Sequence, residues 1–483
     1  MNQRYFGWIL ALAIIVLVLA NIVRGDFILA GGSVMLFFLV PMIAQPSFFW
    51  MATIITLGSG FSLGLSDELN LHSVFVLCFV ALIIIKLAIS GRHSIQNSVP
   101  RKACIALLFV TILTAFIRGW GLKILDSATW GGMQYVNLIG ALLFYLHSAH
   151  VTISQKQLER TLRWLFMLSL LPAAGCLLVH FMPSMKWVEN VVPIDKAELQ
   201  WQTSEGMRWF TLQSSAMWMG VLALFVYDRR SKFTPAVVLV SALSFVLLGL
   251  SGHRTVAVLL GLTTFVYMMV KRLEVRLFQF VKLTGVLIVL VTIIYFFVGD
   301  LPGTFQRALT WLPGIDVAHE VKLEASNTSE WRIELWRQLL LMVPDYLWIG
   351  RGLAFSQIDT QSASTLASDF GTQYVFLSAV HLYHNGPLWL ILDLGLAGFV
   401  SGLIFMMGGI AHYGRHLRSI PDGSRWSRAY IVFYSFFVGE CVFFSKVFGA
   451  GKTFCVIVIL ASILEVIVRS VGAEAEPDDV RLK

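Results

Sequence analysis

The chain has 483 residues, of which 57% are hydrophobic and 13% charged, and its formal net charge is +8. An ordinary soluble domain carries about 25% charged residues, so this composition excludes a protein whose main solvent is water. Apolar runs close to the ~20 residues that cross a bilayer recur along the chain. We therefore expect an all-α, polytopic transmembrane bundle.

The first apolar run, Trp8 to Val23, follows a short segment that contains Arg4, as in a secretory signal peptide. A second run, Phe27 to Ala44, follows immediately, so the sequence predicts a retained helix. Continuing along the chain gives about 14 helices. The predicted spans are residues 6–23, 27–44, 47–65, 71–89, 103–121, 131–149, 162–182, 211–227, 235–250, 254–270, 281–298, 388–411, 429–445 and 452–469.

The loops between these spans divide the basic residues unequally. With the N-terminus in the cytoplasm, most of the 36 lysine and arginine residues fall on the cytoplasmic side, as the positive-inside rule predicts. The positive net charge is therefore explained by the orientation of the helices in the membrane, and we expect no nucleic-acid partner. The even number of spans places the C-terminus in the cytoplasm as well.

Two outer segments, residues 183–210 and 299–387, are longer than the usual connection between helices. Long loops often carry function, and a helical fold is expected for the second one. The chain then divides into N-terminal helices (1–234), a central region (235–411), and C-terminal helices with a cytoplasmic tail (412–483). All five cysteines fall inside apolar runs, so we expect neither a disulfide nor a thiolate metal site. They are Cys78, Cys104, Cys176, Cys441 and Cys455.

The turn Ser251-Gly-His-Arg-Thr255 lies between two predicted spans at the outer face. Arg254 opens a helix there, so its guanidinium and the free N–H groups of the first helical turn point the same way. This arrangement suits a phosphate or pyrophosphate oxygen. An interfacial arginine that extends to lipid headgroups is an equally good interpretation of this motif alone.

An amphipathic helix is predicted in the long loop, from Ser329 to Val343, with Asn327 and Glu330 as its start signal. At 3.6 residues per turn, Arg332 shares a face with Trp336, whereas Arg337 shares one with acidic residues. Arg337 is therefore expected to form exposed pairs, and Arg332 to lie among apolar residues, where it needs an anion.

The loop returns to the membrane through His381-Leu-Tyr-His-Asn385. His384 is a candidate general base because histidine exchanges a proton near neutral pH, and Asn385 is placed to orient His384 or the substrate. A capping or interfacial role for His384 is the alternative. Asp393 and Glu440 are predicted inside spans, where ionisable residues are costly, and are candidates for supporting the site.

Together these motifs resemble the O-antigen ligase and polymerase family, in which they occur in the same order. The matching elements are Ser251-Gly-His-Arg254, Arg332-Ile-Glu-Leu-Trp336, Pro344 with Gly350-Arg-Gly352, His384-Asn385, and Asp393-Leu-Gly395-Leu-Ala-Gly398. Three features depart from the family pattern. His253 replaces a small or polar residue, Gly386-Pro387 interrupts the run after His-Asn, and Asp393 replaces the commoner glutamate.

The resemblance implies a glycosyltransferase of the GT-C type in the bacterial inner membrane, which takes a glycan from undecaprenyl pyrophosphate at the periplasmic face. It assigns pyrophosphate or substrate binding to Arg254 and Arg332, and the essential histidine role to His384. The acceptor is a lipid A-core (ligase) or a further lipid-linked glycan (polymerase), and the sequence leaves both open. The enzyme is expected to work without a metal or cofactor and to invert the anomeric carbon.

Two other functions fit a chain of many helices. A lipid-linked oligosaccharide flippase or other transporter would show repeated halves and broken helices near the midplane, whereas this chain has one asymmetric outer loop. A membrane scaffold for other envelope enzymes would show no gathering of polar groups beside that loop.

Overall fold

The structure, a computed structural model, describes residues 98–121, 129–182, 202–271, 295–356 and 381–475, with short gaps inside these ranges, and a few isolated residues elsewhere. This part is almost entirely helical. Two pairs of two-residue antiparallel strands accompany the helices: β1 (Thr129–Trp130) with β4 (Phe355–Ser356), and β2 (Gln202–Thr203) with β3 (Gly206–Met207). The helices are α5 (Val99–Arg118), α6 (Gly132–Ser148), α7 (Gln155–Leu168), α8 (Leu171–Phe181), α10 (Leu212–Arg230), α11 (Pro235–Ser251), α12 (Arg254–Val270), the 3-10 helix η3 (Val298–Asp300), α14 (Gly303–Leu309), α15 (His319–Tyr346), α18 (Gly386–His416), α19 (Arg425–Lys446) and α20 (Gly451–Ala475).

Several of the described helices can cross a membrane. Five segments are long and apolar enough: Val99–Arg118, Gln155–Phe181, Gly386–His416, Arg425–Lys446 and Gly451–Glu474. Three shorter apolar helices are Leu212–Tyr227, Pro235–Ser251 and Arg254–Val270. The all-α, multi-pass prediction is confirmed for this part of the chain. The predicted spans before residue 90, most of span 281–298 and most of loop 183–210 lie outside the described residues.

The span predicted at 162–182 is not one straight helix. The structure begins a helix earlier, at Gln155, where Ser154 and Gln157 form a reciprocal capping box. It then breaks the helix after Leu168 and starts α8 at Leu171. Pro172 explains the break, because proline has no N–H to donate and its ring clashes with the carbonyl four residues earlier.

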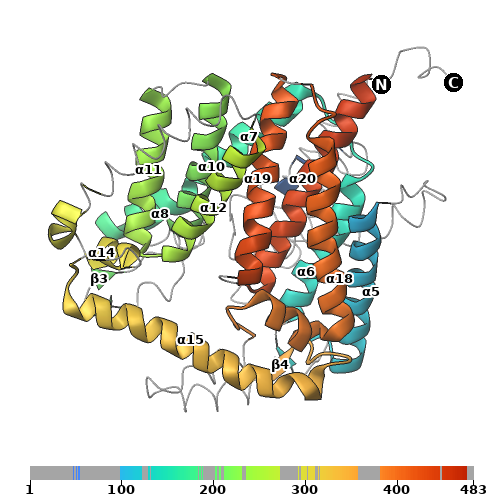
Figure 1. The fold of residues 1–483 in the computed structure, drawn as a ribbon, viewed down its shortest axis with the longest axis horizontal. Coiled ribbons are helices and arrows are strands. Elements are labelled where there is room, and N and C mark those ends of the chain that lie inside the picture. The colour runs from blue at the N-terminus through green and yellow to red at the C-terminus, as the bar shows by residue number, and fades with distance from the viewer. Residues whose placement is uncertain are drawn as a thin grey trace, which may run out of the picture.

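The centre of the bundle consists of α18, α19 and α20, with α5 against α18, α6 against α20 and α12 against α19 (Figure 1). Trp389, Phe444 and Phe454 are buried where the three central helices meet, with ring centroids 5.4 to 6.4 Å apart. Within lipid, such packing stabilises helix association directly, because burial from water is not available as a driving force. This aromatic cluster anchors the first turn of α18.

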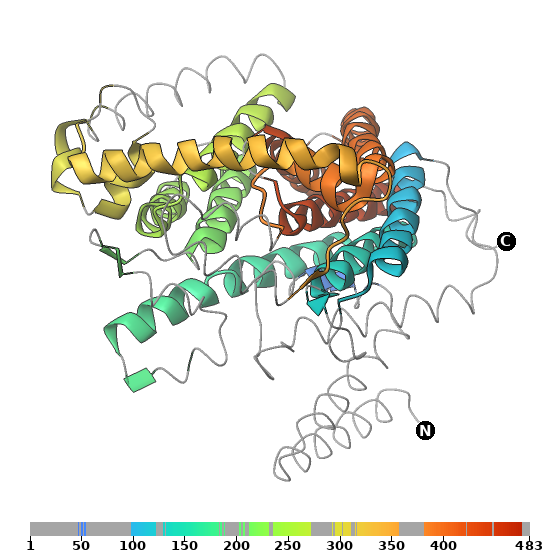
Figure 2. The same cartoon turned by 90° about the horizontal axis from the view of Figure 1, so that it is seen from below.

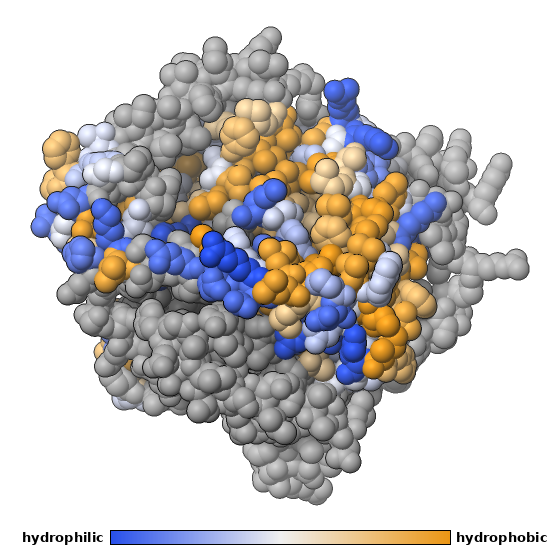
Figure 3. All heavy atoms as spheres, turned by 60° about the horizontal axis from the view of Figure 1, so that its bottom comes forward, coloured by the Kyte–Doolittle hydropathy of each residue, from blue (hydrophilic) through white to orange (hydrophobic). Residues whose placement is uncertain are grey.

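Helix α15 lies across one end of the upright helices, as both ribbon views show (Figures 1 and 2). We call this end the α15 end. A view with this end forward shows hydrophilic residues in a band beside hydrophobic ones (Figure 3). The described part of the predicted loop is largely helical, as expected. The predicted helix start at Asn327 is wrong, since α15 begins at His319 without a side-chain cap.

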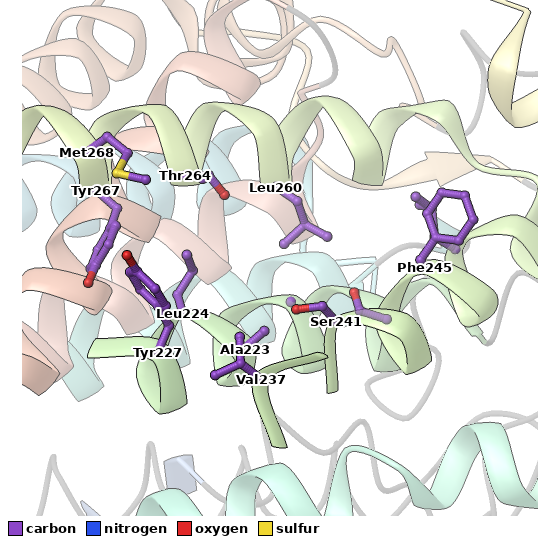
Figure 4. Close-up of a pocket in the computed structure, with 13 residues that line it drawn as sticks. Ala223, Leu224, Tyr227, Val237, Ser241, Phe245, Leu260, Thr264, Tyr267 and Met268 are labelled. Atoms are coloured by element: carbon purple, nitrogen blue, oxygen red, sulfur yellow. The ribbon is translucent and has the colours of Figure 1, made fainter. Parts of the chain in front are cut away.

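Consecutive helices α11 and α12 pack on different partners, α11 on α10 and α12 on α19. A cavity of about 250 Å³ lies between α10, α11 and α12 (Figure 4). Its walls are mainly apolar, as at Leu224, Leu260 and Met268, with the hydroxyls of Ser241 and Thr264 among them. None of the site residues predicted from the sequence lines this cavity.

Candidate active site

Asn385 is the N-cap of α18. Its side-chain Oδ1 accepts a hydrogen bond from the N–H of Leu388 at 3.1 Å. Pro387 follows in the first turn, where a missing N–H costs little because the first N–H groups of a helix have no intrahelical acceptor. The Gly386-Pro387 pair therefore begins the helix rather than interrupting a functional segment. The cap gives Asn385 a structural role, and its role in substrate binding stays a prediction.

Helix α18 is kinked at Gly395, which has φ 72° and ψ −175°. A Cβ atom at Gly395 would lie 2.6 Å from the carbonyl oxygen of Trp348, so only glycine fits. One residue on, the N–H of Leu396 donates to the carbonyl of Leu347 at 2.6 Å. The end of α15 is therefore docked onto the kink by backbone contacts.

The turn Gly350-Arg351-Gly352 continues this docking. Both glycines have positive φ, 78° and 87°. The N–H of Arg351 donates to the Leu392 carbonyl at 2.6 Å, and that of Gly352 to the Asp393 carbonyl at 3.0 Å. The two glycines of the family motif thus permit a left-handed turn and a close approach to α18.

Asp393 is the centre of a buried polar network just before the kink. The hydroxyl of Tyr383 donates to Asp393 Oδ1 at 2.7 Å, and His381 Nδ1 lies 2.8 Å from the same oxygen. The side chains of His381 and Asp393 are completely buried, and Tyr383 is 0% exposed. A buried carboxylate is tolerable when it is hydrogen-bonded in this way. Asp393, predicted as a supporting residue, thus holds the segment that leads to His384.

Two further residues attach Tyr383 to the rest of the α15 end. Arg351 Nη1 donates to the Tyr383 hydroxyl at 3.4 Å, and the indole N–H of Trp336 donates to the Tyr383 carbonyl at 2.9 Å. Burial lowers the pKa of Arg351, but the Tyr383 phenol and the Asp393 carboxylate outweigh it and leave this pKa raised. Burial also raises the pKa of Tyr383, which keeps its hydroxyl protonated and able to donate.

The two arginines of α15 differ as predicted. Arg337 pairs with Glu334 at 3.5 Å, and its side chain is 73% exposed. Arg332 lies on the same face as the buried Leu335 and Leu339. Burial lowers the pKa of Arg332, and the charge of Arg254 lowers it further.

Arg254 is the first residue of α12, directly after a turn with Gly252 at φ 64°. Its Nη1 donates to the hydroxyl of Thr310, which follows α14, at 3.2 Å. The N-cap residue His253 makes no side-chain cap hydrogen bond, so the first amides of α12 are not capped by it. Arg254 therefore lies at the N-terminus of α12, as expected, and its role in binding an anion stays a prediction.

His384 completes the group at the α15 end. Burial lowers its pKa to about 3, and the charge of Arg332 contributes to this shift. The charge of Arg254 thus acts on Arg332, and the charge of Arg332 acts on His384. At neutral pH the imidazole carries no proton on its second nitrogen and can accept one.

His381 and His384 have positive φ, 60° and 53°, and they are the non-glycine residues with this property in the described part of the chain. Such backbone conformations cost about 1–3 kcal/mol each and persist only where the surroundings hold them. They cluster at active sites, ligand clamps and switch regions.

Other residues singled out in the sequence take no part in the contacts described above. Glu440 is buried on α19, and none of the hydrogen bonds above involves it. The four described cysteines are free thiols. Among the described residues no three His, Cys, Asp or Glu side chains come together to hold a metal ion, and metal independence stays a prediction.

Comparison with known families places this group in context. Residues 237–403 match the family described as O-antigen ligase. No curated protein matches the chain. The matched region runs from α11 into α18 and includes Arg254, Arg332, His384, Asn385 and Asp393. The resemblance expected from the sequence is therefore confirmed for this region.

Proposed function

We propose that this chain, a multi-pass membrane protein whose residues 237–403 form an O-antigen ligase region, transfers or polymerises glycan from undecaprenyl pyrophosphate. The reaction would take place at the periplasmic face of the bacterial inner membrane, with both chain termini in the cytoplasm. One observation carries the proposal: α12, α15 and the segment before α18 bring Arg254, Arg332 and His384 together, so that the charge of Arg254 acts on Arg332 and that of Arg332 on His384.

Arg254 and Arg332 are the proposed donor-binding residues. Burial lowers the pKa of Arg332, and the positive charge of Arg254 lowers it further, so the two guanidinium groups repel each other. A pyrophosphate between them would replace this repulsion by attraction and accept charge-assisted hydrogen bonds from both guanidinium groups. The N-terminal amides of α12 would add donors to the same anion.

His384 is the proposed general base. A hydroxyl oxygen of the acceptor attacks the anomeric carbon of the donor sugar while His384 takes the hydroxyl proton. The bond between that carbon and the pyrophosphate oxygen breaks, and the electron pair leaves with the pyrophosphate. Arg254 and Arg332 stabilise the charge that develops on this leaving group. Direct displacement inverts the anomeric carbon.

Donor binding would also make His384 a stronger base. The pKa of His384 is held near 3 by burial and then by the charge of Arg332. A bound pyrophosphate would offset that charge, so the pKa of His384 would rise in the donor complex. The pKa of His384 would then come closer to the operating pH, where a general base is most effective, only when the donor is bound.

The acceptor, a lipid A-core or a growing lipid-linked glycan, is not decided by these residues. A flippase would use the two arginines to hold the same headgroup but would need no base. The decisive experiment therefore targets His384, in a strain that depends on this protein and with purified protein in parallel.

His384→Ala should lower the transfer rate by about 10²- to 10⁴-fold, the usual contribution of a general base. Arg337→Ala is the matched control, because Arg337 is exposed on α15 and already paired with Glu334. Undecaprenyl-linked precursor should accumulate at the periplasmic face in the His384 strain. Precursor retained on the cytoplasmic side would favour the flippase. Normal glycan assembly by a normally produced His384→Ala variant would contradict the mechanism.

A further inference from the structure

The backbone at His384 is fixed from both sides. On one side, Tyr383 is 0% exposed and is held at its hydroxyl by Asp393 and at its carbonyl by Trp336. On the other side, Asn385 caps α18. His384 itself has φ 53°, a conformation that a side chain other than glycine rarely adopts unless it is held.

The Trp336 hydrogen bond joins this segment to the helix that carries Arg332. Arg332 and Trp336 are four residues apart on α15 and therefore lie on one face, one turn apart. The indole N–H of Trp336 reaches the Tyr383 carbonyl at 2.9 Å, in the peptide bond that leads into His384. One hydrogen bond therefore spans from the Arg332 turn of α15 to the backbone of His384.

The other end of this link is fixed by α18. The hydroxyl of Tyr383 donates to Asp393 at 2.7 Å. The carbonyl of Asp393 accepts from Gly352 at 3.0 Å, in the turn that follows α15. The connection thus forms a closed path from α15 through Tyr383 and Asp393 back to the end of α15.

We propose that Trp336, Tyr383 and Asp393 are positioning residues that set the distance and orientation of His384 relative to Arg332. This inference rests on the proposed function of His384 as the base and Arg332 as a pyrophosphate ligand. In the sugar transfer, the attacking hydroxyl and the leaving pyrophosphate lie on opposite sides of one carbon atom. The base and the cation must therefore be held in a fixed geometry, and a misplacement of about 1 Å can cost about 10²-fold in rate.

The test uses Tyr383→Phe, which removes one hydroxyl and keeps the buried ring, and Trp336→Phe, which removes the indole N–H. Steady-state transfer is measured with purified full-length protein, an undecaprenyl-pyrophosphate-linked glycan as donor, and its natural acceptor. We expect kcat to fall by about 10- to 100-fold while KM for the donor changes by less than about twofold. Combining Tyr383→Phe with Asp393→Asn should give much less than the product of the two single effects, because both act through one hydrogen bond.

Tyr413→Phe is the matched control. Tyr413 lies on α18, which Tyr383 precedes in the chain. Like Tyr383 it is 0% exposed, and its hydroxyl is also hydrogen-bonded, to Tyr145 at 3.2 Å and Glu465 at 3.3 Å. Thermal unfolding of Tyr383→Phe and Tyr413→Phe should shift by similar amounts, but kcat should fall only in Tyr383→Phe. Equal effects on kcat in both variants, or none in Tyr383→Phe, would overturn the inference.

The pH dependence of kcat separates positioning from direct proton transfer by Asp393. A positioning role leaves the acid limb of the profile in Asp393→Asn where it is in the unmodified protein, at a lower plateau. Loss or displacement of that limb would assign Asp393 to proton transfer and overturn the inference. If His384→Ala retains full activity, the proposed function itself fails. If His384→Ala is inactive and Tyr383→Phe is normal, only the positioning role fails.

Discussion

The two ends of the helical bundle both bury charged groups, but they stabilise them differently. At the end opposite α15, Glu465 faces Arg469 at 3.5 Å and His412 at 3.9 Å, and Tyr413 donates to it at 3.3 Å. At the α15 end, the charges of Arg254 and Arg332 repel each other. The opposite end surrounds one buried carboxylate with cations, of which Arg469 also acts on the like charge of Arg101. The α15 end combines the hydrogen-bonded Asp393 network with two arginines that repel each other.

The backbone conformations of the two ends also differ. The groups around Glu465 lie on regular helices, whereas His381 and His384 both have positive φ and α18 is kinked at Gly395. Unfavourable conformations and like charges persist in proteins where function requires them. The strained backbone at the α15 end therefore supports the proposal that the chemistry takes place there.

Among the tests of this comparison, the largest effect should follow from removing one of the repelling charges. Arg332→Gln should lower kcat/KM by about 10²- to 10³-fold, because it removes a donor to the leaving pyrophosphate in the transition state. Arg337→Gln, five residues along the same helix, should stay within about twofold, since its side chain is 73% exposed. Transfer assays on both purified variants provide the measurement. Equal losses of kcat/KM in the two variants would show that α15 contributes only its overall positive charge and not a specific contact of Arg332.

Gly395→Ala tests the strained backbone of the α15 end. The alanine Cβ would meet the Trp348 carbonyl at 2.6 Å and would have to adopt φ 72°. We expect a loss of about 3 kcal/mol in unfolding free energy, measured by thermal or chemical denaturation in detergent.

The control for this glycine comes from the opposite end. Gly472 lies in α20 with open space where a Cβ would be. Gly472→Ala should therefore leave stability unchanged or raise it by up to about 1 kcal/mol. A destabilisation as large as that of Gly395→Ala would mean that the kink is not what distinguishes the two sites.

The sequence predicted the local features of this architecture well. The span predicted at 254–270 coincides with α12, because an apolar run bounded by a glycine turn and a basic residue marks both ends of a helix. The contrast between Arg332 and Arg337 followed from helical periodicity alone. Local patterns of this kind led to Arg254, Arg332 and His384 as candidate site residues, and their roles stay predictions.

Contacts between distant segments could not be predicted in this way. The docking of Arg351 onto Leu392 is a backbone hydrogen bond, to which the side-chain pattern contributes nothing. His381 and Tyr383 stand two residues apart, a spacing that places side chains on one side of an extended segment. Their hydrogen bonds to Asp393 depend on the course of α18 past them, which the local pattern does not encode.

The start of α15 at His319 was missed for a different reason. The sequence offers a capping signal at Asn327, and the helix begins eight residues earlier with Ala318 as an N-cap that provides no side-chain hydrogen bond. A capping residue in the sequence does not by itself fix where a helix begins, because tertiary packing can override local propensity.

A pH-dependent stability should belong to His384. Its folded-state pKa of about 3 lies below the unfolded value near 6.5, so below pH 6.5 the unfolded chain binds a proton that the folded protein excludes. The stabilisation is fully present above pH 6.5 and is lost as the pH falls toward 3. At pH 5 the loss should be about 2 kcal/mol relative to pH 7. The unfolding free energies of the unmodified protein and of His384→Gln, each measured at pH 5 and pH 7, isolate the contribution of His384. The same change in unfolding free energy with pH in both proteins would exclude a buried neutral histidine.

The smallest effect is expected at the shortest ion pair of the opposite end, between Arg425 and Glu159 at 2.9 Å. Their side chains are 52% and 31% exposed, so water and salt screen the attraction. Arg425→Gln should therefore cost less than about 1 kcal/mol in unfolding free energy, and less still in 1 M salt. Because the opposite end has no proposed part in the chemistry, the transfer rate should remain within about twofold of the unmodified protein. Denaturation at two salt concentrations and one transfer assay suffice. A rate loss comparable to that of Arg332→Gln would show that the charges of the two ends act on the reaction together, and the division between them would then be wrong.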